Sequence, residues 1–205
     1  MVIPLDARLV LDWDGTVTER DSLMMVLEEF GDWDECRRLG EQLFRGEITL
    51  HEEIERQFLT VTAPLPEVAA WVVENVRVRA GLAELVERFH PVVVSSGMHE
   101  LIEPVLALEG VEVELLANRV DPRPDGWRVL WRDQTVCAVC GQACKRALLP
   151  SVDELVYVGD GYSDRCAALA AKRVFARRGL AAYLDEQGLA YEPFDDLNDI
   201  AAALA

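Results

Sequence analysis

No apolar run in the sequence approaches the roughly 18 residues that a membrane-spanning helix requires, and no basic-then-apolar leader stands at the N-terminus. These absences predict a cytoplasmic protein with no membrane partner. Basic residues are also scarce, because 20 Lys and Arg stand against 37 Asp and Glu and leave a net charge of −17. This charge repels the phosphates of nucleic acids, so we expect no nucleic-acid partner. The oligomeric state is left open by the sequence.

Cysteine is sparse and odd in number, the five being Cys36, Cys137, Cys140, Cys144 and Cys166. In a cytoplasmic chain, cysteines are more often free thiols or metal ligands than members of disulfides. The run from Cys137 through Cys140 to Cys144 supplies three thiolates, which hold Zn²⁺ if a fourth ligand comes from Cys36, Cys166 or a histidine. A redox pair is a second interpretation. Structural zinc sites usually show a second CxxC pair, which this sequence lacks, so inert thiols are favoured.

The 205 residues are 51% hydrophobic, enough for one domain with a sizeable core or a domain with an insertion. Short apolar segments between polar or glycine residues predict strands at 8–12, 91–95, 111–116, 154–158 and 174–176. A hairpin is predicted from residues 118–120 and 127–131. Helical patterns, such as those at 99–108 and 163–172, alternate with the strands. The alternation predicts an α/β fold with a Rossmann-like parallel sheet and helices on both faces.

The segment between the first two strands has helical patterns throughout and is too long for a simple crossover. The residues placed to begin its helices are Asp21, Asp32, Thr49 with Glu52 as a capping box, and Pro66. We therefore predict a small all-helical cap domain over residues 19–79. It is inserted after the first strand of a core domain that comprises residues 1–18 and 80–205.

Polar residues that could take part in catalysis or metal binding lie near the strand ends of the predicted sheet. They are Asp12, Asp14 and Thr16 after the first strand, Ser95 and Ser96 after the second, Lys145 before the fourth, and Asp160 and Asp164 after it. Ligands of open α/β sheets bind beyond the carboxyl ends of the strands, so these side chains are expected to converge. Several carboxylates in one cleft cannot all ionise without a counter-charge. Oxygen ligands at this charge density suit Mg²⁺, and Lys145 adds a second positive charge.

A metal ion, a lysine, and hydroxyl or amide donors after a strand together make a phosphate-binding site. A carboxylate in such a site can attack phosphorus and form an aspartyl-phosphate. A second acid two residues further on is placed to protonate the leaving oxygen and later to deprotonate the attacking water. These residues therefore predict phosphoryl transfer from a small phosphorylated metabolite.

Four motifs stand in one order along the chain: DWDGT (12–16), VVVSSG (92–97), a lone lysine at 145, and GDGYSD (159–164). In this order they resemble the haloacid-dehalogenase-like (HAD) phosphohydrolases, and the resemblance covers most of the chain. It implies a HAD-like core and Mg²⁺-dependent hydrolysis of a phosphomonoester through an aspartyl-phosphate.

The resemblance also implies a role for each matching residue. Asp12 is the nucleophile, Asp14 the general acid/base, and Lys145 steadies the phosphoryl charge. The Asp12 carboxylate, the Asp14 backbone carbonyl and Asp160 hold Mg²⁺, while Asp164 is an outer-shell acid that orients water or Lys145. Contacts to substrate or phosphate are implied for Thr16, Ser95, Ser96 and Gly97.

The helical insertion resembles the cap of the phosphoserine-phosphatase-like subgroup. Within it the likeness is closest to the phosphatases of methionine salvage that act on 2-hydroxy-3-keto-5-methylthiopentenyl-1-phosphate. It rests on the first motif, on Ser95-Ser-Gly-Met98 and on the cysteine-rich stretch before Lys145. Those relatives often show Ser-Gly-Gly at the second motif. Phosphoserine is the alternative substrate, with Asp21 where the phosphoserine enzymes carry a glutamate that helps to bind the amino group.

Three other functions compete with phosphatase activity. A signalling receiver domain also phosphorylates an aspartate beside Mg²⁺, but it has no cap and no acid in the place of Asp14. A phosphotransferase or mutase of the same fold passes the phosphoryl group to an acceptor other than water. A silent binding protein is disfavoured because all the expected acids are present. Arg20, Arg45 and Arg56 of the insertion are candidate substrate contacts, although a solvated helix face is the more common role for such residues.

Overall fold

The computed structural model describes residues 9–149 and 154–205. Two segments of the predicted core domain lie outside the described residues, namely 1–8 and 150–153. The first of them includes residue 8 of the predicted first strand. In the described part, no helix combines the length and apolar character needed to cross a membrane. The cytoplasmic location stays a prediction.

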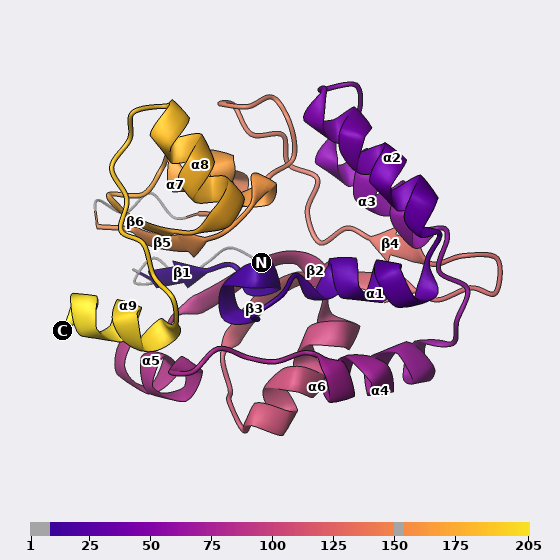
Figure 1. Cartoon of the computed structure of the whole chain (residues 1–205), viewed down its shortest axis with the longest axis horizontal. Helices are drawn as coiled ribbons and strands as arrows, with labels where there is room; N and C mark the ends of the chain where they lie inside the picture. The colour runs from indigo at the N-terminus through magenta and orange to yellow at the C-terminus, as the bar shows by residue number, and fades with distance from the viewer. Residues whose placement is uncertain (1–8, 150–153) are drawn as a thin grey trace.

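Within the described residues, six strands form one sheet in the order β4-β3-β2-β1-β5-β6 (Figure 1). Their bounds are β1 (Leu9–Leu11), β2 (Val92–Met98), β3 (Glu114–Asp121), β4 (Arg128–Leu130), β5 (Val156–Gly159) and β6 (Arg173–Ala176). All neighbouring pairs are parallel except β3 with β4, the hairpin predicted from the sequence. The predicted α/β fold is therefore confirmed, with an antiparallel edge strand. Since β1 lies between β2 and β5, the ends of these three strands meet at one edge.

Helices cover both faces of the sheet (Figure 1). Their bounds are α1 (Ser22–Phe30), α2 (Trp33–Phe44), α3 (Leu50–Phe58), α4 (Leu65–Asn75), α5 (Leu82–Phe89), α6 (His99–Glu109), α7 (Arg165–Ala168), α8 (Arg178–Glu186) and α9 (Leu197–Leu204). Strand residues alternate between the faces. Leu9 and Leu11 share one core with apolar residues of α4, α5, α6 and α9, while Val10 shares the other with α7 and α8.

Two elements differ from the sequence prediction. The segments predicted separately at 111–116 and 118–120 belong to one strand, β3, which begins at Glu114. Asn118 is compatible with a strand here because its side-chain amide donates to the Ser96 carbonyl (2.8 Å) and accepts from the Arg132 amide (3.1 Å). The helix predicted at 163–172 is reduced to a 3-10 turn and α7. It ends early because the Lys172 amide donates to the Leu155 carbonyl (2.9 Å), where pairing of β5 with β6 begins.

The helices α1, α2 and α3 of the insertion begin as predicted. Asp21 and Asp32 each accept a hydrogen bond from a first-turn amide, and Thr49 forms its capping box with Glu52. The chain leaves and re-enters the sheet region at one place, where Thr18 and Val78 form an antiparallel bridge. Helix α4 packs against α6 (Figure 1). The division at residues 19 and 79 stays a prediction.

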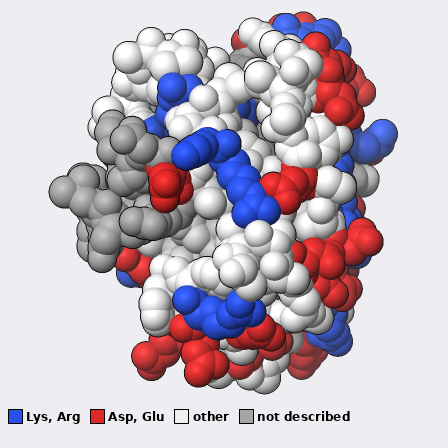
Figure 2. Space-filling model, turned by 90° about the vertical axis from the view of Figure 1, so that its left-hand side faces the viewer, with Lys and Arg blue, Asp and Glu red and all other residues white. Residues whose placement is uncertain are grey.

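Charged side chains of both signs share the surface. Figure 2 shows one face on which Lys and Arg side chains form a short band beside Asp and Glu side chains. Pairing of this kind is seen at Arg173, which donates two hydrogen bonds to Glu192, one of them 2.8 Å long. Arg178 lies 3.7 Å from the Asp160 carboxylate.

Candidate active site

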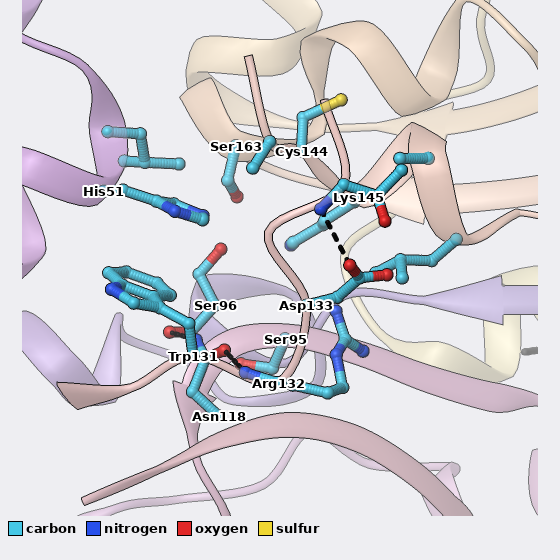
Figure 3. Close-up of a pocket in the computed structure, with 15 residues that line it drawn as sticks. His51, Ser95, Ser96, Asn118, Trp131, Arg132, Asp133, Cys144, Lys145 and Ser163 are labelled. Carbon is cyan, nitrogen blue, oxygen red and sulfur yellow. Dashed lines mark hydrogen bonds between the residues drawn. The ribbon is translucent and has the colours of Figure 1, made fainter. Parts of the chain in front are cut away.

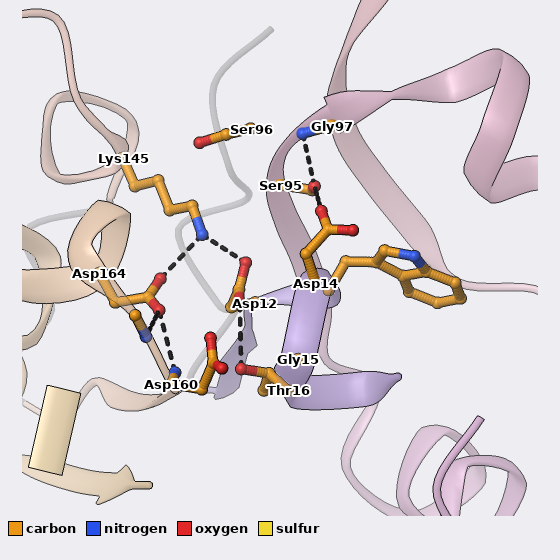
Figure 4. A network of polar contacts seen from close by, with 12 residues as sticks. Asp12, Asp14, Gly15, Thr16, Ser95, Ser96, Gly97, Lys145, Asp160 and Asp164 are labelled. Carbon is orange, nitrogen blue, oxygen red and sulfur yellow. Dashed lines mark hydrogen bonds and ion pairs between the residues drawn. The ribbon is translucent and has the colours of Figure 1, made fainter. Parts of the chain in front are cut away.

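The predicted acids converge at the carboxyl ends of β1 and β5 (Figure 4). Asp12 directly follows β1, and its amide donates to the Val158 carbonyl of β5 (2.9 Å). Asp160 directly follows β5. One carboxylate oxygen from each of Asp12, Asp160 and Asp164 lies within 4.8 Å of the other two. The parallel pairing of adjacent strands thus brings together residues far apart in the sequence.

Asp12 is held at both carboxylate oxygens. The Thr16 hydroxyl donates to Oδ2 (3.0 Å), and the Lys145 ammonium donates to Oδ1. All three residues are buried. Burial raises the pKa of Asp12 well above its ordinary value, and nearby Asp164 raises it further, while Lys145 opposes both effects. The carboxylate is therefore fixed in position, and its charge depends on neighbouring cations.

Asp164 organises Lys145 and the turn after β5 (Figure 4). Its Oδ1 accepts from the Lys145 ammonium (2.8 Å) and from the Tyr157 hydroxyl (2.6 Å), and its Oδ2 accepts from the amides of Asp160 and Gly161 (3.0 Å each). Burial alone lowers the pKa of Lys145, but Asp12 and Asp164 outweigh it and hold that pKa above the ordinary value. Lys145 is thus a permanent cation between two carboxylates.

Asp14 is bound by two hydroxyl groups. Ser95 donates to Oδ2 (3.0 Å) while accepting from the Gly97 amide (2.8 Å), and Ser22 donates to Oδ1. Burial raises the pKa of Asp14, and these two hydroxyls lower it in part. Ser22 opens α1, so Asp14 is in contact with the first helix of the insertion. The sequence carried no signal for Ser22 beyond its place after a helix cap.

Gly15 is required by the close approach of Asp160. It has φ +77°, a left-handed conformation that favours glycine. A Cβ atom at this position would lie 2.3 Å from Asp160 Oδ2. Burial, followed by the charge of Asp164, raises the pKa of Asp160 to about 7. The glycine of the first motif thus lets two loops bring their acids together.

A model of the haloacid dehalogenase-like hydrolase family matches residues 9–169. The chain belongs to this family. The resemblance seen in the four motifs is therefore confirmed.

Relatives with a named activity align with nearly the whole of this chain. This chain is 25% identical to the 2-hydroxy-3-keto-5-methylthiopentenyl-1-phosphate phosphatase of Bacillus cereus (strain B4264), over 98% of this chain and 96% of the relative. The enzyme of that name from Bacillus mycoides (strain KBAB4) is 24% identical over the same shares. These matches confirm the likeness to the methionine-salvage phosphatases.

Phosphoserine phosphatases share the fold. A structure described as a phospho-aspartyl intermediate analogue of phosphoserine phosphatase has a TM-score of 0.68 and 18% identity, covering 96% of this chain and 98% of that one. The phosphoserine phosphatase of T. onnurineus has a TM-score of 0.64 and 21% identity, covering 95% and 92%. At these identities the likeness concerns the fold alone.

The acids of the hydrolase line a cavity of about 140 Å³ between the sheet edge and the insertion. Asp12, Asp14 and Asp160 lie on its walls, together with Ser96 and Asp21. Most of the apolar lining comes from the insertion, namely Leu23, Met24, Leu27, Leu50, Ile54 and Phe58, and Tyr162 adds an aromatic ring from the turn after β5. A ligand in this cavity would meet both carboxylates and aliphatic or aromatic side chains.

A smaller cavity of about 30 Å³ lies beside Ser95 and Lys145 (Figure 3). His51 of α3 stacks on Trp131 along it, with ring centroids 3.7 Å apart. Arg132 also lines it. Its Nε and Nη1 atoms are buried and have no hydrogen-bond partner among residues 9–149 and 154–205. Two buried N–H groups without a hydrogen-bond partner are costly, which indicates a place for an anion or for water.

Arg132 is a candidate that the sequence interpretation missed. Its only signal was its place just beyond a predicted hairpin arm. The arginines named instead have surface partners: Arg20 pairs with Glu28 (2.9 Å), Arg45 with Glu47, and Arg56 donates to a glutamine (3.3 Å).

Proposed function

We propose that this hydrolase is a Mg²⁺-dependent phosphatase that acts on a small phosphomonoester through an aspartyl-phosphate at Asp12. One observation carries the proposal: Asp12, Asp14 and Asp160 line one cavity, and the Lys145 ammonium donates a hydrogen bond to Asp12. One carboxylate is fixed for attack, a second stands two residues further on, and a buried cation lies beside them. This is the set of groups that phosphoryl transfer through a carboxylate requires.

The chain's own residues account for both chemical steps. An Asp12 oxygen forms a bond to phosphorus, and the bond from phosphorus to the ester oxygen breaks as Asp14 gives that oxygen a proton. Asp14 then takes a proton from water as the water oxygen attacks phosphorus and releases Asp12. Burial raises the pKa of Asp14, which favours the protonated form that the first step uses. Thr16 and Lys145 position Asp12. A direct phosphate contact for Thr16, Ser95, Ser96 or Gly97 stays a prediction.

The donor set fits Mg²⁺. The Asp12 and Asp160 carboxylates and the Asp14 backbone carbonyl would hold the ion, since Mg²⁺ takes oxygen ligands and usually one or two carboxylates. The fit is supported by carboxylate oxygens of Asp12 and Asp160, which lie within 4.8 Å of each other, and by Gly15, which leaves room for Asp160. A bound Mg²⁺ supplies positive charge to the phosphoryl oxygens. Asp164 already accepts four hydrogen bonds, so we assign it to the outer shell.

For the substrate we propose the enol phosphate after which the Bacillus relatives are named. Its methylthio tail suits the apolar lining that the insertion provides. Phosphoserine carries an ammonium and a carboxylate, which need polar partners. Asp21 in the same cavity supports phosphoserine as the second candidate. We also propose that residues 19–79 form the cap that encloses the substrate. The chain passes from the core to this segment and back at one place, the bridge between Thr18 and Val78.

Phosphate release from a panel of phosphomonoesters tests this function. The panel includes the enol phosphate, phosphoserine and simple alkyl phosphates, each with Mg²⁺ and with a chelator. We expect release that the chelator abolishes and Mg²⁺ restores, with the highest kcat/KM for the enol phosphate. Faster turnover of phosphoserine would replace the substrate assignment. No release, together with transfer to an added alcohol, would favour a phosphotransferase.

Arg132→Ala is expected to raise KM by about 10- to 100-fold, because a charge-assisted hydrogen bond to an anionic substrate is lost. Steady-state kinetics with the preferred substrate measures the change. Arg20→Ala is the matched control, since Arg20 pairs with Glu28 at the surface. An unchanged KM in Arg132→Ala would remove this residue from the substrate site.

Gly15→Ala is expected to lower kcat by about 10²-fold, because the new Cβ forces Asp160 to move. Gly110→Ala is the control: Gly110 has φ +66° and no atom within 4 Å of its Cβ position. Both variants carry the strain of a left-handed alanine, so the difference in kcat isolates the contact with Asp160. Equal activities in the two variants would show that the contact does not matter.

A further inference from the structure

Four cysteines from two separate segments meet beside the candidate active site. Cys137, Cys140 and Cys144 belong to the loop before Lys145, and Cys166 belongs to α7. Their Sγ atoms all lie within 4.8 Å of one another. The Sγ atoms of Cys137 and Cys166 are 3.9 Å apart, and those of Cys140 and Cys144 are 3.5 Å apart. All four are free thiols.

These separations match a tetrahedral metal site. A zinc–sulfur bond of about 2.3 Å in a tetrahedron puts sulfur atoms about 3.8 Å apart. A disulfide, by contrast, needs about 2.05 Å. We propose that Cys137, Cys140, Cys144 and Cys166 bind one structural Zn²⁺ ion. The assignment stands independently of the proposed phosphatase activity, because it uses none of the acids.

The loop around the first two cysteines is a tight turn suited to a metal. Cys137 donates its amide to the Gln142 carbonyl (2.9 Å), and its own carbonyl accepts from the Gly141 amide (2.9 Å). Gly141 has φ +70°, which allows the chain to reverse directly after Cys140. The Val139 amide points at Cys137 Sγ (3.4 Å). Amide donors of this kind stabilise a thiolate, the form in which sulfur binds zinc.

Few other interactions hold this loop. Between β4 and the 3-10 turn Lys145–Leu148 its only regular pairing is the Val136–Ala143 bridge, within the part of the chain that the structure describes. Val136 and Val139 are 65% and 60% exposed, so they contribute little to a core. A loop of this length and exposure needs another source of order. Four sulfur–metal bonds would provide it and leave no open coordination position, as in structural zinc sites.

The ion would also join two catalytic segments. Cys144 directly precedes Lys145 (Figure 3), and Cys166 lies two residues after Asp164. The carbonyl of Cys166 accepts from Arg146 Nη1 (3.4 Å). Zinc would thus fix the loop that carries Lys145 against the helix that follows Asp164. The four cysteines are positioning residues on this account, since none touches the reacting groups.

Metal analysis of the full-length protein tests the site. We purify it with a reducing agent and without chelator, after growth with added zinc, and measure zinc by mass spectrometry. Zinc X-ray absorption then identifies the ligands. We expect one zinc per chain with four sulfur neighbours at about 2.3 Å. Cys140→Ser and Cys166→Ser should each lower the zinc content at least tenfold, while Cys36→Ala keeps one zinc because Cys36 lies in the core of the insertion.

Wild-type protein also answers the question if the variants fail to fold. Reduced protein freed of metal should bind one Co²⁺ per chain, with the strong visible absorption of tetrahedral cobalt thiolates, and its Tm should rise when zinc is restored. Absence of zinc together with no Co²⁺ binding would overturn the assignment. Zinc with oxygen neighbours, iron in place of zinc, or a mass lowered by a disulfide would overturn it too. The zinc assignment is judged from metal content and ligands, so phosphatase activity that needs only Mg²⁺ neither supports nor overturns it.

Discussion

Asp12→Asn is expected to lower kcat by about 10⁴-fold or more, because an amide cannot attack phosphorus as a carboxylate does. The side chain keeps its size and can still accept from the Thr16 hydroxyl. Lys145 keeps its partner Asp164 (2.8 Å), so no buried cation is left unpaired. The variant should therefore fold normally. Phosphate release with saturating substrate and Mg²⁺ measures the loss.

The matched control is Asp34→Asn, which makes the same chemical change on the exposed surface of α2. Its kcat should equal that of the wild type. Circular dichroism and Tm of both variants exclude unfolding as the cause. Near-normal turnover in folded Asp12→Asn would remove Asp12 as the nucleophile.

Asp14→Asn is expected to lower kcat by about 10²- to 10⁴-fold, because the general acid/base is lost while the nucleophile remains. The step most affected depends on the leaving group. A phenolic leaving group needs little protonation, so phosphorylation of Asp12 should continue with p-nitrophenyl phosphate. Attack of water on the aspartyl-phosphate then becomes limiting.

Stopped-flow absorbance distinguishes the two steps. Asp14→Asn should release a burst of p-nitrophenol approaching one equivalent per chain, followed by slow turnover. Ser22→Ala tests the contact that holds Asp14 from the insertion; it keeps the acid and should show turnover without an accumulated burst. A slow linear phase without a burst in Asp14→Asn would contradict its role in hydrolysing the phosphorylated enzyme.

The sequence predicted the residues whose chemistry depends on local motifs. Asp12 and Asp160 stand directly after β1 and β5, Asp14 follows two residues after Asp12, and the parallel pairing of β1 with β5 brings the three acids together. The α/β fold could be predicted because apolar runs and helical patterns alternate along the whole chain.

What could not be predicted depends on contacts between distant segments. Ser22 reaches Asp14 only because the insertion folds back over the sheet edge. Arg132 has no motif, and its two nitrogens without a hydrogen-bond partner are visible only where the loop after β4 meets Lys145. Cys166 was one of several possible fourth ligands, and its approach to Cys137 depends on how α7 packs. Residues 111–116 and 118–120 were predicted as separate segments, because the hydrogen-bond partners that hold Asn118 within one strand are not local.

The most direct test of the central claim is to locate the phosphoryl group. Folded Asp14→Asn is mixed with substrate and Mg²⁺, quenched, reduced with borohydride and mapped by peptide mass spectrometry. Reduction of an aspartyl-phosphate leaves homoserine, so we predict homoserine at position 12, and only when substrate was present. The double variant Asp12→Asn/Asp14→Asn should show none. Homoserine at another aspartate, or none anywhere while turnover persists, would contradict the account that Asp12 carries the phosphoryl group.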